Sequence, residues 1–451
     1  MPKRHGFSCE RAELDSLAHA ALERARRAGA SACDCDVSEG YGLSVTVRKG
    51  RPDTIEHNRD RSVGVTVYLG DRPKVRRGHA STSDFSRAAL EQTVDAAAAI
   101  ARHTAEDDCA GLPDAELLAR EQPDLDLFHP WEISTEEAVE LARRCEAAAF
   151  AVSKKIRNSE GATVSAQQTQ FVFANSLGFV GGFCGSRHWL SCAVIAEDKG
   201  LMQRDDWYSA SRLPGKLADA RALGRYAGQR AAARLGARKM ATRQAPVLFE
   251  APVAVGLIGH FVSAVTGGNL YRKTSFLVDT LGKQVFSPLV AIDERPHEPQ
   301  GMASSPFDEE GVATIERPIV RAGAVEGYFL GSYAARKLGM KSTGSAGGHH
   351  NLVVRSEGPD FEGMLKTMGR GLLVTELLGQ GVNPVTGDYS RGAAGYWVEG
   401  GEIAFPVEEI TIAGNLKEMF KQIAAIGSDV VVRSGRSTGS ILVESMTIAG
   451  E

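Results

Sequence analysis

Apolar side chains in the first half of the chain recur with two different periods, and each period predicts its own kind of element. Apolar and polar residues alternate over residues 43–47 and 63–69, which predicts strands with one buried face. Residues 10–28 place leucine and alanine at helical spacing, and an alanine-rich stretch extends from about residue 84 to 102. We therefore expect two helices that pack one side against these strands.

The same two patterns return after a polar, proline-bearing stretch at residues 105–130, which predicts a long connection. Ser134 is followed three residues later by Glu137, a pairing typical of the first turn of a helix. Strand patterns occupy most of residues 155–196, and residues 217–235 predict another helix. Strands and helices do not alternate strictly, so the pattern indicates an α+β fold.

The character of the chain changes near residue 241. Residues 1–240 contain 19 of the 49 glycines, whereas residues 241–451 contain 30 of them between short apolar runs. Dense glycine favours turns, bulges and close backbone approaches. We expect an N-terminal α+β domain over residues 1–240, with 1–110 and 130–240 as two subregions, and a glycine-rich, mainly β domain over residues 241–451.

Composition excludes several classes of protein. Hydrophobic residues make up 43% of the chain, charged residues 24%, and the formal net charge is −4. These totals do not predict the basic surface of a nucleic-acid-binding protein. No apolar run is long enough to span a bilayer, and the first ten residues carry no apolar signal segment, so we expect a cytoplasmic protein without membrane contact. The odd number of cysteines, seven, does not predict a disulfide framework.

Four segments of the second half have distinctive amino-acid sequences. They read GHFVSAVTGGNLYRK at residues 259–273, SYAARKLG at 332–339, GDYSRGAAGYWV at 387–398 and PVEEITIAGNL at 406–416. Together they closely resemble the PmbA (TldE) branch of the TldD/PmbA metallopeptidase family. The resemblance implies the fold of that family, whose C-terminal domain is mainly β with mixed-sheet and barrel-like character.

The resemblance also implies a cytoplasmic proteolytic pair. TldD is the metallopeptidase member of this pair, PmbA is its paralogous partner, and the pair is linked to the cleavage of unfolded peptides. We therefore expect no cofactor in this chain, zinc on a TldD-like partner, and a heterodimer or larger assembly, with a homodimer of the chain alone as an open alternative. An older family description, modulator of DNA gyrase, supports a different interpretation in which the chain is a binding protein.

The expected metal site departs from the metallopeptidase pattern. TldD proteins carry HExxxH and a distant C-terminal cysteine, because imidazole and thiolate bind zinc and a glutamate can take a proton from metal-bound water. Here His260 remains, but Phe261 replaces the glutamate, Val265 replaces the second histidine, and no cysteine follows Cys192. A single imidazole does not make a zinc site, so we expect no catalytic residue and no metal ligand set in this chain. Metallopeptidase activity of the chain itself remains the alternative.

His260 lies in a stretch, residues 253–265, that is apolar on nearly all sides and predicts a buried helix. We expect His260 to be a hydrogen-bonded core histidine, and the alternative is a ring that still faces the former metal cleft.

Four charged residues lie inside the segments that carry the resemblance: Arg272, Lys273, Asp388 and Arg391. They are candidates for a peptide channel or a subunit interface. The alternative is that they form structural ion pairs that hold the glycine-rich loops.

The remaining cysteine and histidine motifs are expected to be structural. Cys33 and Cys35 have no second pair at zinc spacing, so we interpret them as small residues that enter a strand. Cys184 and His188 are four residues apart, which on a strand is about 13 Å, too far for a thiol–imidazole hydrogen bond.

The loop at residues 343–348 lacks the lysine of a phosphate-binding loop, and His349 and His350 after it have no acidic residue at helical spacing. We therefore expect neither a phosphate site nor a metal site there. A group of acidic residues in the same half is expected to lie on a solvated loop. It comprises Asp293, Glu294, Glu298, Asp308, Glu309 and Glu310.

Overall fold

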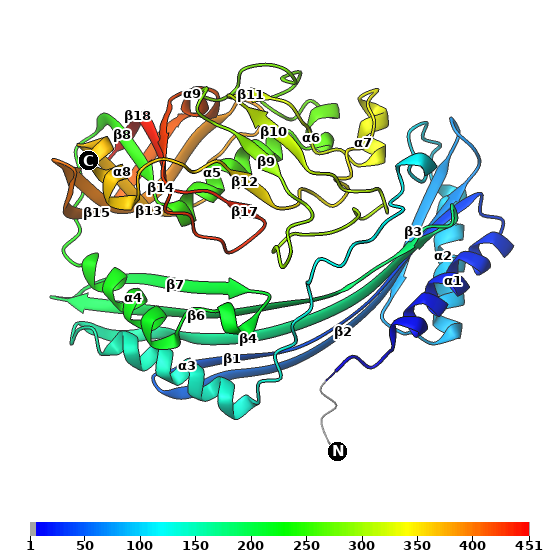
Figure 1. Ribbon diagram of the computed structural model, residues 1–451, viewed down its shortest axis with the longest axis horizontal. Helices are drawn as coiled ribbons and strands as arrows, with labels where there is room; N and C mark the ends of the chain where they lie inside the picture. The colour runs from blue at the N-terminus through cyan, green and yellow to red at the C-terminus, as the bar shows by residue number, and fades with distance from the viewer. Residues whose placement is uncertain (1–5, 451) are drawn as a thin grey trace.

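The computed structural model describes residues 6–450, so residue 451 and residues 1–5, part of the segment in which no secretory signal is expected, lie outside it. A long curved sheet from the first half forms one layer, and the C-terminal half lies over its concave side (Figure 1). Among the described residues, no helix combines the length and the apolar character that crossing a membrane requires.

The curved sheet is antiparallel, with strand order β3-β2-β1-β4-β6-β7 and β5 paired to β4. Its strands are β1 (Ala32–Arg48), β2 (Arg51–Leu69), β3 (Arg76–Thr82), β4 (Ile156–Asn175), β5 (Val180–Gly181), β6 (Cys184–Asp198) and β7 (Leu201–Ser211). The helices of this half are α1 (Arg11–Arg27), α2 (Arg87–His103), α3 (Thr135–Phe150) and α4 (Ala220–Ala233), with short turns η1 (Ala115–Leu117) and η2 (Pro214–Lys216).

Two helix pairs cover the convex side of this sheet, one at each end of its long strands (Figure 1). Residues such as Val37 and Val65 pack against α1 and α2, and Val45 and Val164 pack against α3 and α4. Because side chains alternate across a strand, the opposite set of side chains points to the concave side, toward the C-terminal half.

The sequence predicted the helices of this half closely, including the start of α3, where Ser134 and Glu137 form both hydrogen bonds of the capping box. The predicted strands were too short, since β1 and β2 extend well beyond residues 43–47 and 63–69. Strand β7 was missed. It lies at the edge of the sheet and is mostly polar, so it lacks the alternation that marks a half-buried strand.

The C-terminal half contains a closed barrel, which confirms the barrel-like character expected there. Its strands are β8 (Arg243–Phe249), β13 (Gly371–Leu378), β14 (Asp388–Glu399), β15 (Glu402–Asn415) and β18 (Ile441–Ala449), and β16 (Ile423–Ile426) pairs outside the ring. Pairing of β15 with β18 closes the ring, and β8 and β13 run parallel while the other pairs are antiparallel.

A second, smaller sheet and five helices complete this half. The strands are β9 (Ile292–Glu294), β10 (Arg317–Arg321), β11 (Ala324–Val325), β12 (Leu352–Val354) and β17 (Arg436–Ser437). The helices are α5 (Ala251–Ala264), α6 (Gly267–Tyr271), α7 (Ser332–Lys337), α8 (Phe361–Met368) and α9 (Leu416–Lys421). One continuous apolar core joins the barrel, α5 and the smaller sheet, so α5 is held by packing on several sides.

Candidate functional site

Helix α5 carries the degenerate metal motif and is the apolar helix that the sequence predicts. It follows β8 directly and begins after Glu250, with proline in its first turn, which suits the start of a helix. Phe261 is fully buried, with its ring centroid 4.9 Å from that of Phe286 and 6.4 Å from that of Phe420. Val265 is also fully buried. Both side chains fill the core and leave no polar group there.

His260 differs from the expected hydrogen-bonded core histidine. The residue is only half-buried, its ring lies edge-on to Tyr389 with centroids 5.9 Å apart, and it forms no hydrogen bond with a described residue. Burial, and then the charges of Arg391 and Arg436, lower the pKa of His260 from its ordinary value of 6.5. The expectation of a hydrogen-bonded core histidine is therefore wrong for His260.

The groups around His260 do not fit a zinc ion. Zinc in proteins takes thiolate, imidazole or carboxylate ligands, at least three from the protein in a catalytic site. The described groups that act on His260 are a tyrosine ring and the guanidinium groups of Arg391 and Arg436, which would repel a dication. His260 is therefore a side chain of a type that binds zinc, but its charged neighbours are the cations Arg391 and Arg436.

A cleft of about 360 Å³ opens between the N-terminal end of α5, strand β7 and the chain before β17. We name it the arginine cleft, because Arg391, Arg433 and Arg436 line it. Its walls also include Trp207 from β7 and Val253 from α5. The guanidinium carbon of Arg433 lies 3.8 Å from the ring centroid of Trp207, so a cation lies over an aromatic face.

The acidic residues of the arginine cleft already have partners. Asp206 pairs with Arg204. The other three form a connected set with Arg230 and Arg234, whose guanidinium groups pair with the carboxylates of Asp205, Glu250 and Glu376. Arg230 is central to it: its Nε lies 3.1 Å from Asp205 and its Nη1 lies 2.7 Å from Glu250. Arg391, Arg433 and Arg436 form no ion pair with any residue from 6 to 450, although the charge of Glu250 acts on Arg433.

A wider cleft of about 890 Å³ lies between the concave face of the sheet and the C-terminal half. Asp34 and Tyr68 line it from the sheet, and Thr266 and Gly267, just beyond α5, line it from the other side. Burial raises the pKa of Asp34 to about 6, although the Tyr68 hydroxyl donates a hydrogen bond of 3.0 Å to its carboxylate. The two ends of α5 thus border two different clefts.

The structure does not bring the four charged candidates together. Arg272 and Lys273 are exposed after α6, where Arg272 donates to the Tyr271 hydroxyl over 3.0 Å. Asp388 is exposed and accepts hydrogen bonds from Thr386 and Asn415, which lower its pKa. Only Arg391 lines the arginine cleft. None of the four forms an ion pair with a described residue, so the ion-pair alternative is wrong for them.

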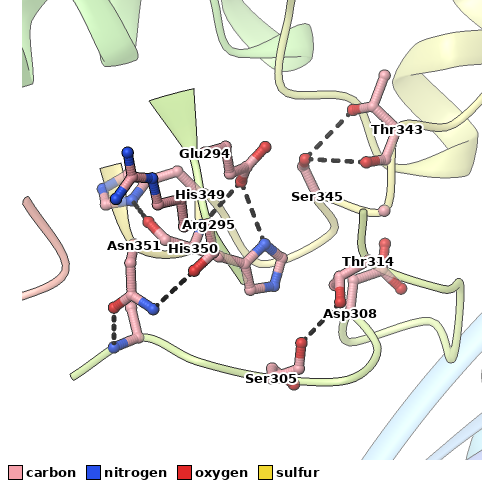
Figure 2. A network of polar contacts seen from close by, with 12 residues as sticks. Glu294, Arg295, Ser305, Asp308, Thr314, Thr343, Ser345, His349, His350 and Asn351 are labelled. Carbon is pink, nitrogen blue, oxygen red and sulfur yellow. Dashed lines mark hydrogen bonds and ion pairs between the residues drawn. The ribbon is translucent and has the colours of Figure 1, made fainter. Parts of the chain in front are cut away.

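The acidic group expected on a solvated loop is partly buried. Glu294 on β9 is 2% exposed, and its Oε1 accepts hydrogen bonds from the backbone N–H of His350 at 2.9 Å and from its Nδ1 at 3.1 Å (Figure 2). Arg317 donates to Oε2 of the same carboxylate over 2.8 Å. His350 is therefore held by an acidic partner distant in sequence, which the search at helical spacing could not find.

Asp308 is also buried, at 3% exposure, and its carboxylate accepts the backbone N–H groups of Glu310, Val312 and Ala346. The loop at residues 343–348 is thus tied down by a side chain. Burial raises the pKa of Asp308 to about 7. These contacts hold glycine-rich loops together, and the expectation of a solvated segment is wrong for Glu294 and Asp308.

The Glu294 network gives a pH-dependent prediction. Burial alone would raise the pKa of Glu294, but hydrogen bonds from His350 and the charge of Arg317 outweigh it and lower the pKa below its ordinary value of 4.5. A lowered carboxyl pKa contributes stability that is present above the unfolded value and is lost as pH falls through the folded value. Glu294→Gln should lower the free energy of unfolding by about 2 kcal/mol at pH 7. In urea denaturation this difference from the wild type should shrink below about pH 4; a difference independent of pH would contradict the assignment.

The other candidates are structural, as predicted. Cys33 and Cys35 are buried in β1, and burial raises both thiol pKa values. His188 is fully buried in β6 and its Nε2–H donates to the carbonyl of His129 over 2.8 Å, so it does not serve Cys184. Within residues 6–450, Asp107, Asp108 and Cys109 bring three potential metal-binding atoms close together. Lys337 already forms ion pairs with both carboxylates.

Sequence reasoning missed Arg433 and Arg436, because they lie outside the segments that carry the resemblance. The sequence does hold a signal: two arginines three residues apart follow the apolar run Val430–Val432, with no acidic residue between Asp429 and Glu444. A search for metal ligands does not consider arginines that follow an apolar run without acidic residues nearby in the sequence.

Comparison with known families accounts for most of the chain. Models of the PmbA/TldA metallopeptidase match in three parts: domain 1 at residues 33–101, the central domain at residues 128–235 and the C-terminal domain at residues 242–450. The chain is 48% identical over 442 residues to the Metalloprotease PmbA of Escherichia coli O157:H7, with 98% of this chain and 97% of that protein covered. It is 45% identical over 442 residues to a Metalloprotease PmbA homolog of Haemophilus influenzae, with 97% and 96% covered.

Solved structures share the fold. A proposed modulator of a DNA gyrase from Thermotoga maritima superposes with a TM-score of 0.87 at 26% identity, covering 96% of this chain and 100% of that one. TldE from Thermococcus kodakarensis gives a TM-score of 0.84 at 19% identity, covering 97% and 100%, which shows likeness of fold alone.

Proposed function

Since the chain belongs to the PmbA/TldD metallopeptidase family, we propose that it is a subunit of a peptidase assembly that holds no catalytic metal of its own. In this proposal it pairs with a TldD-like paralogue in the cytoplasm, as a heterodimer or a larger assembly. It helps to enclose unfolded peptides, and the zinc of the partner performs hydrolysis. A homodimer is the form proposed for the chain without that partner.

The observation that carries the proposal is the chemistry of α5. Phe261 and Val265 are fully buried apolar side chains, and neither can bind a metal or accept a proton. His260 is the one ligand type of the motif that remains, and the positive charges of Arg391 and Arg436 act on it. No cysteine occurs between residues 193 and 451 to supply a thiolate.

The test compares three preparations: this chain alone, its TldD-like paralogue alone, and the two mixed. An unfolded peptide such as reduced, denatured casein is the substrate, and metal content is measured in each preparation. We expect this chain alone to contain no stoichiometric zinc and to leave the peptide intact. We expect the mixture to cleave it faster than the paralogue alone, and the complex to elute as one species on size exclusion.

The matched control is His260→Ala. It should leave zinc content and hydrolysis by the mixture unchanged, because in this proposal His260 binds no metal. Stoichiometric zinc that is lost in His260→Ala, or cleavage by the chain free of its partner, would establish the chain as a metallopeptidase in its own right. The description of the relatives from Escherichia coli and Haemophilus influenzae as metalloproteases favours that alternative.

A second candidate function follows from the description of the Thermotoga maritima structure as a proposed modulator of a DNA gyrase. In that role the chain would act by binding gyrase, without hydrolysis. Purified gyrase subunits and this chain, mixed without the TldD-like paralogue, discriminate the two. Co-elution would support the modulator role, and separate elution would set it aside.

A further inference from the structure

We propose that the arginine cleft binds the carboxylate group of a peptide. The inference starts from three cations without an ion-pair partner: the guanidinium groups of Arg391, Arg433 and Arg436 line a cleft of about 360 Å³ and form no ion pair with any residue from 6 to 450. The acidic groups of the same cleft are engaged by other arginines. Partly buried cations that form no ion pair within the protein favour an anionic ligand.

Unused hydrogen-bond donors gather in the same place. Among the described residues, eight buried side-chain atoms lack a hydrogen-bond partner, and three of them belong to residues that line the arginine cleft: Nε of Arg391, Nη2 of Arg433 and Oγ1 of Thr375. All three groups can donate to an oxygen atom. Buried donors are nearly always satisfied in folded proteins, so their concentration in one cleft points to a bound acceptor.

The backbone of α5 makes room for one of these cations. Gly259 has no side chain, and a Cβ atom at that position would overlap Nη1 of Arg436. A glycine in the interior of a helix lowers stability relative to alanine. Its presence here allows the Arg436 guanidinium group to lie directly against the helix, beside His260, whose pKa it lowers.

The walls of the cleft indicate what carries the anion. Val253 and Leu377 line it beside Trp207, whose ring Arg433 covers. Apolar and aromatic walls around a few charged donors suit the carboxylate of a peptide, since guanidinium groups bind carboxylates through paired hydrogen bonds. This choice of carrier deepens the proposed function and rests on it, whereas the anion site itself rests on the charges alone. The carboxylate can come from a peptide C-terminus or from an aspartate or glutamate side chain.

The experiment measures binding to the purified chain by titration calorimetry, with no hydrolysis involved. The probes are N-acetyl-trialanine with a free C-terminus, the same peptide as its C-terminal amide, and N-acetyl-Ala-Asp-Ala amide. We expect at least one of the two carboxylate peptides to bind about tenfold or more tightly than the neutral amide, with affinity falling as salt rises. The better of the two identifies the source of the carboxylate. Equal binding of all three probes, or no binding at millimolar concentration, would overturn the proposal.

Three variants locate the site. Arg391→Met combined with Arg436→Met should abolish the preference for carboxylate. Gly259→Ala should weaken it severalfold by displacing the end of Arg436, while the melting temperature stays equal or rises, which separates lost binding from lost folding. Arg225→Met, on an exposed arginine of α4 outside the cleft, should bind as the wild type does. A preference that survives in the double variant would overturn the site, whereas the hydrolysis assays of the mixed subunits would still decide the proposed function.

Discussion

Replacement of Arg230 by methionine should lower the free energy of unfolding by about 3–5 kcal/mol, since it leaves buried Glu250 without its ion-pair partner and Asp205 with Arg234 alone, at 3.7 Å. Arg230 extends from α4 to Asp205 of β7 and to Glu250 at the start of α5, with side-chain exposures of 12%, 9% and 9%. Burial alone would lower the pKa of Arg230, but Glu250 and Asp205 outweigh it and raise that pKa. Urea denaturation at pH 7 measures the loss.

The control for this prediction is Arg225→Met, on the same helix. Arg225 is exposed and forms no ion pair with a described residue, so its replacement should change stability by at most about 0.5 kcal/mol. Adding Asp205→Asn and Glu250→Gln to Arg230→Met should recover part of the loss, because neutral amides are less costly to bury than charges. A loss below about 1 kcal/mol in Arg230→Met would show that water reaches the ion-pair network.

The sequence predicted the helices that have a signal within their own residues, such as a capping box or an apolar run. The helix that begins after Ser134 was found from its capping box, and α5 was found because nearly every residue in it is apolar. Strand β7 was not, because an edge strand with polar residues on both faces has no period to detect. The barrel was expected from a resemblance, since its closure depends on β15 and β18, whose pairing no local signal encodes.

Some features of the candidate site could likewise be predicted from the local sequence, and others could not. The loss of the metal motif could be inferred from two letters, Phe261 and Val265, because residue type alone decides whether a side chain can bind zinc. The surroundings of His260 could not, since Arg391 and Arg436 come from strands far along the chain. Burial of Glu294 likewise depends on partners from separate strands and loops. Electrostatic environment is a property of the assembled fold, and the sequence alone leaves it open.

Restoring the motif glutamate should be strongly destabilising. Phe261 is fully buried and edge-on to the rings of Phe286 and Phe420, so Phe261→Glu replaces these aromatic contacts by a carboxyl group with no partner. We expect the free energy of unfolding at pH 7 to fall by at least about 4 kcal/mol. We also expect no gain of zinc, because the second histidine and the thiolate are still absent. Urea denaturation and metal analysis of the purified variant provide the measurements.

Phe261→Leu separates the effect of charge from the effect of lost volume, and should cost about 1–1.5 kcal/mol. A buried glutamate has a raised pKa, so its protonated form is preferred in the folded protein. The deficit of Phe261→Glu relative to Phe261→Leu should therefore be smallest below about pH 4 and grow as pH rises above that value. If the two variants are equally stable at neutral pH, the glutamate reaches water and the position faces a cleft. The core then does not exclude the catalytic group, and the argument that α5 has become structural at this position fails.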